Sequence, residues 1–66
     1  MLEIVESFYH ETYIVKKNKV VIGNFTPSTG YGSELHFEVN GGILTSNDLK
    51  RISESLGQLN YERRKV

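Results

Sequence analysis

The segment from residue 44 to residue 59 constrains the fold most, because its apolar residues recur at the spacing of an α-helix. The apolar positions form one stripe: Leu49, Ile52, Leu56 and Leu59. Charged and polar residues fall on the opposite side: Lys50, Arg51, Glu54 and Gln58. This pattern predicts an amphipathic helix over residues 45–59 whose apolar stripe packs on another apolar surface.

The start of the predicted helix carries a capping signal. Thr45 is a favoured N-cap residue, and Asp48, three positions later, can accept a hydrogen bond from the backbone N–H of Thr45. Leu44 and Leu49 have the spacing of a hydrophobic staple, which fixes the angle at which the chain enters the helix. The first turn of the helix is therefore well specified.

The C-terminal end of the helix is less well defined. Gly57 costs about 1 kcal/mol relative to alanine inside a helix, so the helix either stops there or continues past it. Residues 60–66 are either a frayed continuation of the helix or a tail, and we assign them as a tail. Three consecutive basic residues, 63–65, make this tail either a solubilising end or a weak anion-binding patch.

Length, charge and cysteine content limit what the chain can be. Its 66 residues predict a single domain over 1–66, which buries only about 60% of the unfolded surface. Without cysteine, neither disulfides nor a cysteine zinc site can stabilise it, so oligomerisation, with a dimer favoured, is the expected support. Eight basic and eight acidic residues cancel, which disfavours nucleic acid as a partner.

The distribution of apolar residues bears on location. No apolar run reaches the roughly 18 residues of a membrane span, and the N-terminus lacks the basic start of a signal peptide. We therefore expect a cytoplasmic protein without a membrane contact.

Residues 1–44 have the composition of a β-sheet. Residues 2–10 are either a strand or a short helix, with strand favoured by adjacent β-branched and aromatic residues. Residues 12–15 and 20–25 predict a hairpin, residues 34–40 alternate as a half-buried strand, and residues 43–44 could add a very short strand. The expected fold is α+β: an antiparallel meander of three to five strands with the C-terminal helix on one face.

The predicted hairpin is apolar on both faces. A two-residue turn at residues 17–18 pairs Val15 with Val20 and Tyr13 with Ile22, which places these four on one face. The other face then carries Ile14, Val21 and Phe25. One helix covers only one face, so we expect the second face, extended by Tyr9 and His36, to contact another subunit or a partner. The alternative is a register shifted by one residue, or a sheet that curls around its own core.

The loop over residues 26–33 is the candidate binding segment. Its small polar residues and glycines surround one tyrosine: Ser28, Thr29, Gly30, Tyr31, Gly32 and Ser33. The loop is a plain hairpin linker, a protein-contact loop or a nucleotide-contacting loop. It lacks the lysine of the Walker pattern, and a strand rather than a helix follows it.

The strand over residues 34–40 places Leu35, Phe37 and Val39 towards the core. A polar row occupies the opposite face: Glu34, His36 and Glu38. Such a row needs further ligands to hold a metal, so we expect it to face solvent or a partner, with no metal or cofactor. The single aspartate, Asp48, is already used at the helix start, which disfavours a Ser-His-Asp enzyme, and we expect no catalytic site.

The last thirty or so residues carry a resemblance. An Asn40-Gly41-Gly42 turn leads into the segment 43–52, Ile-Leu-Thr-Ser-Asn-Asp-Leu-Lys-Arg-Ile, in a small chain without cysteine. In this build the chain resembles the small accessory proteins of phages and prophages, among them inhibitors of host defence. The resemblance implies a non-enzymatic protein that acts stoichiometrically on a host protein in the host cytoplasm. Two alternatives stay open: an oligomer that sequesters a small signalling nucleotide, and a small nucleic-acid-binding regulator.

Overall fold

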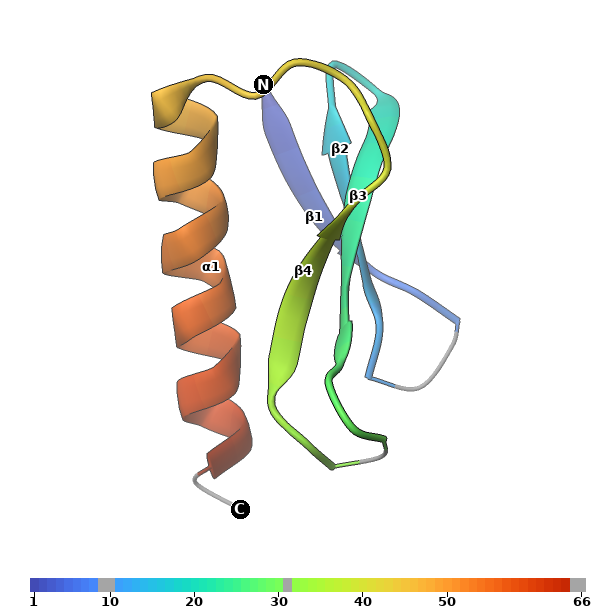
Figure 1. Ribbon diagram of the computed structural model, residues 1–66, viewed down its shortest axis with the longest axis vertical. Helices are drawn as coiled ribbons and strands as arrows, with labels where there is room; N and C mark the ends of the chain where they lie inside the picture. Colours follow the sequence, from blue (N-terminus) through green and yellow to red (C-terminus); the bar gives the residue numbers. More distant parts are fainter. Residues whose placement is uncertain (9–10, 31, 65–66) are drawn as a thin grey trace.

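A computed structural model describes residues 1–8, 11–30 and 32–64 of the chain. Four strands form one antiparallel meander in the order β1-β2-β3-β4: β1 (Leu2–Glu6), β2 (Tyr13–Lys17), β3 (Val20–Pro27) and β4 (Leu35–Val39). The single helix of the described part, α1 (Ser46–Arg64), lies along one face of the sheet (Figure 1). The α+β prediction is confirmed. Within the described residues, no helix is long and apolar enough to cross a membrane.

The β2–β3 hairpin forms, but with a different turn and register from those predicted. The turn residues are Asn18 and Lys19, whose φ angles of 51° and 69° match the two left-handed positions of a type I′ turn. This turn pairs Lys17 with Val20, and one extra residue in β3 then shifts the register again, so that Val15 pairs with Gly23 instead of Val20 and Tyr13 pairs with Phe25 instead of Ile22. A β-bulge at Ile22 breaks the alternation of β3.

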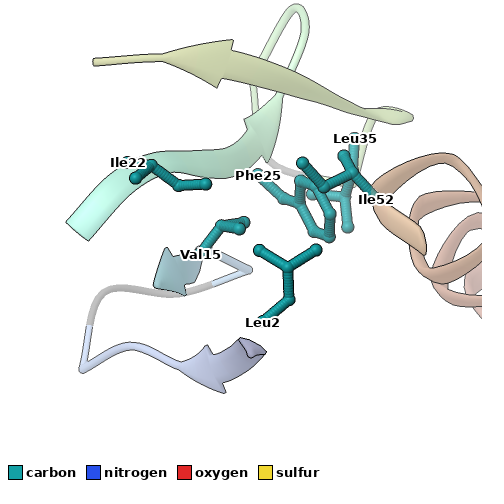
Figure 2. Close-up of a cluster of buried hydrophobic side chains, with 6 residues drawn as sticks. All are labelled: Leu2, Val15, Ile22, Phe25, Leu35 and Ile52. Carbon is teal, nitrogen blue, oxygen red and sulfur yellow. The ribbon is translucent and has the colours of Figure 1, made fainter. Parts of the chain in front are cut away.

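This bulge decides which residues enter the core. Ile22 and Phe25 are three positions apart, a spacing that puts two residues of a regular strand on opposite faces. The extra residue instead lets both point towards the helix, and they are 4% and 0% exposed. The core combines residues from four strands and the helix (Figure 2): Leu2, Val15, Ile22, Phe25, Leu35 and Ile52.

Phe37 of β4 packs beside this core through an edge-to-face contact with Phe25. The two ring centroids lie 5.9 Å apart, with 77° between the ring planes. Gly23 makes room for the Phe37 ring, because a Cβ at Gly23 would lie 2.6 Å from Phe37 Cε1 and 2.5 Å from the Glu38 carbonyl oxygen. A larger residue at Gly23 would therefore displace both the ring and the β4 backbone.

The start of α1 confirms the predicted capping box. The Asp48 N–H donates to Thr45 Oγ1 at 3.1 Å, and the Thr45 N–H donates to Asp48 Oδ2 at 3.0 Å. Lys17 Nζ reaches from β2 to the same Asp48 oxygen at 2.6 Å and also donates to the Ile43 carbonyl at 3.0 Å. The hydrogen bond from Lys17 is the largest cause lowering the pKa of Asp48 from 3.8 to about 2, followed by the Thr45 N–H.

The C-terminal end of α1 differs from the prediction. The helix passes through Gly57 and extends to Arg64, the last described residue, so residues 60–64 are helical and are not a tail. The reason lies at Asn60, which is 6% exposed and contacts the backbone of β4. In the predicted stripe, Ile52 is buried and Leu56 and Leu59 pack against the core, but Leu49 is 49% exposed.

Candidate functional site

The predicted binding loop holds itself together through its own polar groups. Ser33 Oγ donates to the Gly30 carbonyl at 2.6 Å and accepts from the Thr29 N–H at 3.0 Å. Ser28 Oγ donates to the Glu34 carbonyl at 2.8 Å. Tyr31 lies outside the described residues. The loop polar groups that a ligand would need are therefore largely used in shaping the loop.

A junction of three segments anchors this loop, and the sequence did not reveal it. The Gly32 N–H donates to Glu11 Oε2 at 2.8 Å, and Glu11 Oε1 lies 2.5 Å from Arg63 Nη2. Arg63 also donates to the Ser33 carbonyl. Glu11 and Arg63 are 52 positions apart in a chain of 66, so no local pattern could have paired them.

A small depression of about 260 Å³ lies beside this junction. Its lining includes two arginines: Gly32, Ser33, Glu34, Asn60, Arg63 and Arg64. Arg63 is already paired with Glu11, and Arg64 faces Glu34 at 3.6 Å. The depression also lies at the C-terminal end of α1, where the helix dipole is negative. Paired cations and this dipole disfavour a phosphate ligand here, and with it the sequestration of a nucleotide by this loop.

Ser28, His36 and Glu38 form a polar chain on the sheet face away from α1. Ser28 Oγ lies 3.2 Å from His36 Nδ1, and His36 Nε2 lies 2.8 Å from Glu38 Oε2. This order of groups resembles a hydrolytic triad, but the Ser28 hydroxyl proton points to the Glu34 carbonyl. The side chains of His36 and Glu38 are 39% and 56% exposed, so both groups face solvent, whereas nucleophilic catalysis uses groups enclosed in a cleft.

The rest of that sheet face carries two of the predicted partner-contact residues. Ile14 and Val21 lie on the open face, as expected, and Val21 is 46% exposed. Phe25 does not: it is fully buried under the helix, because the bulge reverses the side to which it points. The prediction for Phe25 was therefore wrong. Tyr9 lies outside the described residues. The open face mixes apolar and polar side chains, since Asn24 of β3 pairs with Ile14 of β2 on one side and with Glu38 of β4 on the other.

Metal-ligating residues do not gather on the described surfaces. In residues 1–8, 11–30 and 32–64, no group of three or more histidine, aspartate or glutamate side chains could hold a metal ion. His10, the second histidine of the chain, lies outside these ranges.

A larger groove lies on the helix side of the sheet. Its volume is about 470 Å³, and three partly buried apolar residues form its floor: Ile4, Tyr13 and Leu59. One side of α1 supplies the polar wall: Glu54, Ser55, Gln58 and Glu62. Gln58 Nε2 donates to Glu62 Oε2 at 3.0 Å, one turn further along that wall. In the part of the chain that the structure describes, this wall contains two carboxylates and no basic side chain.

The groove exists because the helix packs on one side of the sheet. Asn60 attaches α1 to β4 through two hydrogen bonds with Leu35, and α1 makes its main strand contacts with β4. The sheet is four strands wide, so a helix held at β4 leaves Ile4 of β1 and Tyr13 of β2 only partly buried, whereas Leu2 and Val15 lie in the core.

The two edges of the sheet differ as a result. At β4, the Asn60 amide satisfies both the N–H and the C=O of Leu35, which point away from β3. At β1, no strand of the described residues lies beyond the edge. The sequence signal that could have indicated the groove is the i, i+4, i+8 spacing of Glu54, Gln58 and Glu62, which places them on one helix face.

Comparison with protein families, curated proteins and solved structures gives no match to this chain.

Proposed function

We propose that this chain is a small, non-enzymatic binding protein that acts stoichiometrically on a target protein through the groove between α1 and the β1–β2 side of the sheet. The observation that carries the proposal is the groove itself, with its apolar floor of Ile4, Tyr13 and Leu59 and its polar wall on α1. An apolar floor with a few polar groups around it is the usual composition of a binding surface.

The shape of the groove favours a macromolecule over a small metabolite. Ile4 and Tyr13 are only partly buried, and Glu54, Gln58 and Glu62 are exposed, so the groove is open along its length. Small-molecule sites usually enclose most of the ligand surface. A protein segment can instead cover an open groove and bury it against its own apolar residues. An inhibitor of a host protein, as the sequence resemblance implies, would act in this way.

A matched pair of serine substitutions tests the use of the groove. Ser55 lies in the polar wall, and Ser53 is exposed on the same helix outside the groove. Ser55→Arg should fill the groove and abolish capture of the target from lysate of the natural host, whereas Ser53→Arg should capture it like the wild type. Circular dichroism melting of both variants checks that the fold is retained.

The outcomes separate clearly. Capture by the wild type and Ser53→Arg but not by Ser55→Arg supports the groove as the binding site. Equal capture by all three proteins would place the contact elsewhere on the molecule. A wild-type protein that retains no protein at all from lysate would contradict the proposed function.

Self-association through the open sheet face stays a prediction. Val21 is 46% exposed and Val5 is 43% exposed, and burying them between two subunits would support a chain with so small a core. Light scattering at micromolar concentration should give a dimer mass, and Val21→Glu should give a folded monomer. A wild-type monomer that is stably folded would contradict this prediction.

A further inference from the structure

We infer that the target presents an extended, basic segment that pairs with the free edge of β1 as a fifth strand and places alternate side chains in the groove. This inference rests on the proposed function and names the chemistry of the partner. It follows from the hydrogen-bond pattern of β1, from the direction of its side chains, and from the charge around the groove.

The hydrogen-bond pattern of β1 shows which backbone groups are available. The Ser7 N–H donates to the Thr12 carbonyl at 2.9 Å, and the Asn18 N–H donates to the Met1 carbonyl at 3.1 Å. In an antiparallel ladder, hydrogen-bonded pairs alternate with pairs that are not bonded to each other. The intervening bonded pairs are therefore those of Glu3 and Val5. The N–H and C=O groups of the alternate residues point away from β2, towards the edge: Leu2, Ile4 and Glu6.

The side chains of these same residues point towards α1. Leu2 is in the core, and Ile4 lies in the floor of the groove. Residues paired directly across two strands project from the same face of the sheet. A strand that bonds to Ile4 from outside therefore directs its paired side chain towards Leu59 and the polar wall of α1. Backbone pairing and groove filling are thus achieved by one extended segment, as in β-strand addition generally.

The charge around the groove selects a basic segment. Glu54 and Glu62 line the helix wall, and Glu6 lies on the β1 edge with its side chain on the same face. Among the described residues, no lysine or arginine lines the groove. A second copy of this chain, paired through its own β1, would present Leu2, Ile4 and Glu6 to the groove, and none of these supplies a positive charge to the carboxylates of the wall. Lysine or arginine at alternate positions of a partner strand would instead face these carboxylates.

The opposite edge of the sheet is capped at Leu35, and α1 packs along β4. Asn60 Oδ1 accepts from the Leu35 N–H at 2.8 Å, and Asn60 Nδ2 donates to the Leu35 carbonyl at 3.1 Å. The side chain of Asn60 thus occupies the place that a neighbouring strand would take at β4. Since β1 has no such cover among the described residues, strand addition is directed to β1.

Amide hydrogen exchange of the ¹⁵N-labelled chain tests the inference with synthetic peptides. The probe is a peptide of about seven residues that alternates lysine and valine, a length suited to one strand. The comparison peptides replace lysine by glutamate, or carry N-methyl groups on the residues that would bond to β1. With the lysine peptide, we expect exchange at the amides of Ile4 and Glu6 to slow at least tenfold, with smaller changes at Glu3 and Val5.

Charge variants provide the second measurement. Glu62→Lys should weaken binding of the lysine peptide about fivefold, since reversing one exposed charge changes the binding free energy by about 1 kcal/mol. Glu38→Lys, on the other face of the sheet, should leave the affinity unchanged. The N-methylated peptide and the glutamate peptide should bind at least tenfold more weakly than the lysine peptide.

Four results would overturn the inference. These are equal binding of the lysine and glutamate peptides, binding without slower exchange at Ile4 and Glu6, equal effects of Glu62→Lys and Glu38→Lys, or no binding of the lysine peptide. Slow exchange at Ile4 and Glu6 that grows with protein concentration and needs no peptide would identify a second copy as the occupant. Failure of strand pairing, with target capture still sensitive to Ser55→Arg, would leave the proposed function standing and refute only this inference.

Discussion

Replacing Asn60 by alanine should remove a large fraction of the free energy of unfolding of this protein, although Asn60 is a polar residue near the end of a helix. Its side chain is 6% exposed and makes both of its backbone contacts with one residue, Leu35. These two bonds connect α1 to β4 across 25 positions of the chain. Removing them leaves the Leu35 N–H and C=O without partners at a buried site.

The expected magnitude follows from the groups left unpaired. A buried donor or acceptor without a partner costs about 1 to 3 kcal/mol, and alanine recovers about 0.5 kcal/mol through its higher helix propensity. Water entering at the β4 edge relieves part of the penalty, so the net loss should be about 1.5 to 3.5 kcal/mol. A domain of this size has a total stability of roughly 3 to 10 kcal/mol. The melting temperature should fall by roughly 6 to 28 °C.

Urea unfolding followed by circular dichroism measures this loss, with Ser53→Ala as the control because Ser53 is exposed on the same helix. Asn60→Asp adds a test specific to the Leu35 contact. An ionised carboxylate at position 60 can accept a hydrogen bond from the Leu35 N–H, but it repels the Leu35 carbonyl oxygen. A protonated carboxyl group has an O–H that can donate to that carbonyl, as the amide does in the wild type. The Asn60→Asp protein should therefore gain stability relative to the wild type as the pH falls. A loss below about 0.5 kcal/mol for Asn60→Ala would refute the reasoning.

Three further predictions concern the core and the helix start. Ile52→Ala should lower the free energy of unfolding by about 2 to 5 kcal/mol because Ile52 is buried. Leu49→Ala should lower it by under about 1 kcal/mol because Leu49 is 49% exposed. Equal losses for the two variants in urea unfolding would contradict this packing. Thr45→Ala should cost about 1 kcal/mol through loss of the cap, and unchanged stability would mean that the cap contributes nothing. The pKa of Asp48 is lowered from 3.8 to about 2. The contribution of the ionised Asp48 to folding stability is therefore present above pH 3.8 and is lost as the pH falls towards 2. The stability difference between the wild type and Asp48→Asn should shrink over that range, and a constant difference would argue against the contact with Lys17.

The sequence by itself determined the elements whose signals are local. The capping box of Thr45 and Asp48 lies within one turn, and both of its hydrogen bonds form as predicted. The alternation of residues 35–39 predicts a strand with one buried face, and the structure contains that strand as β4, with Leu35 buried and Phe37 against the core but Val39 59% exposed. The hairpin and the α+β meander follow from the order of these signals, since consecutive strands with short connections pair as neighbours.

Only the tertiary structure decided the register, the helix end and the candidate site, because each depends on residues that are distant in sequence. The bulge at Ile22 brings Phe25 into the core, a gain that appears only when the helix is present to cover it. Asn60 extends the helix beyond Gly57 because its amide finds Leu35 on another element. The groove follows from the same contact, since holding α1 at β4 uncovers Ile4 and the free edge of β1. A one-dimensional pattern carries the preference of each residue, but it does not carry the position at which two elements meet.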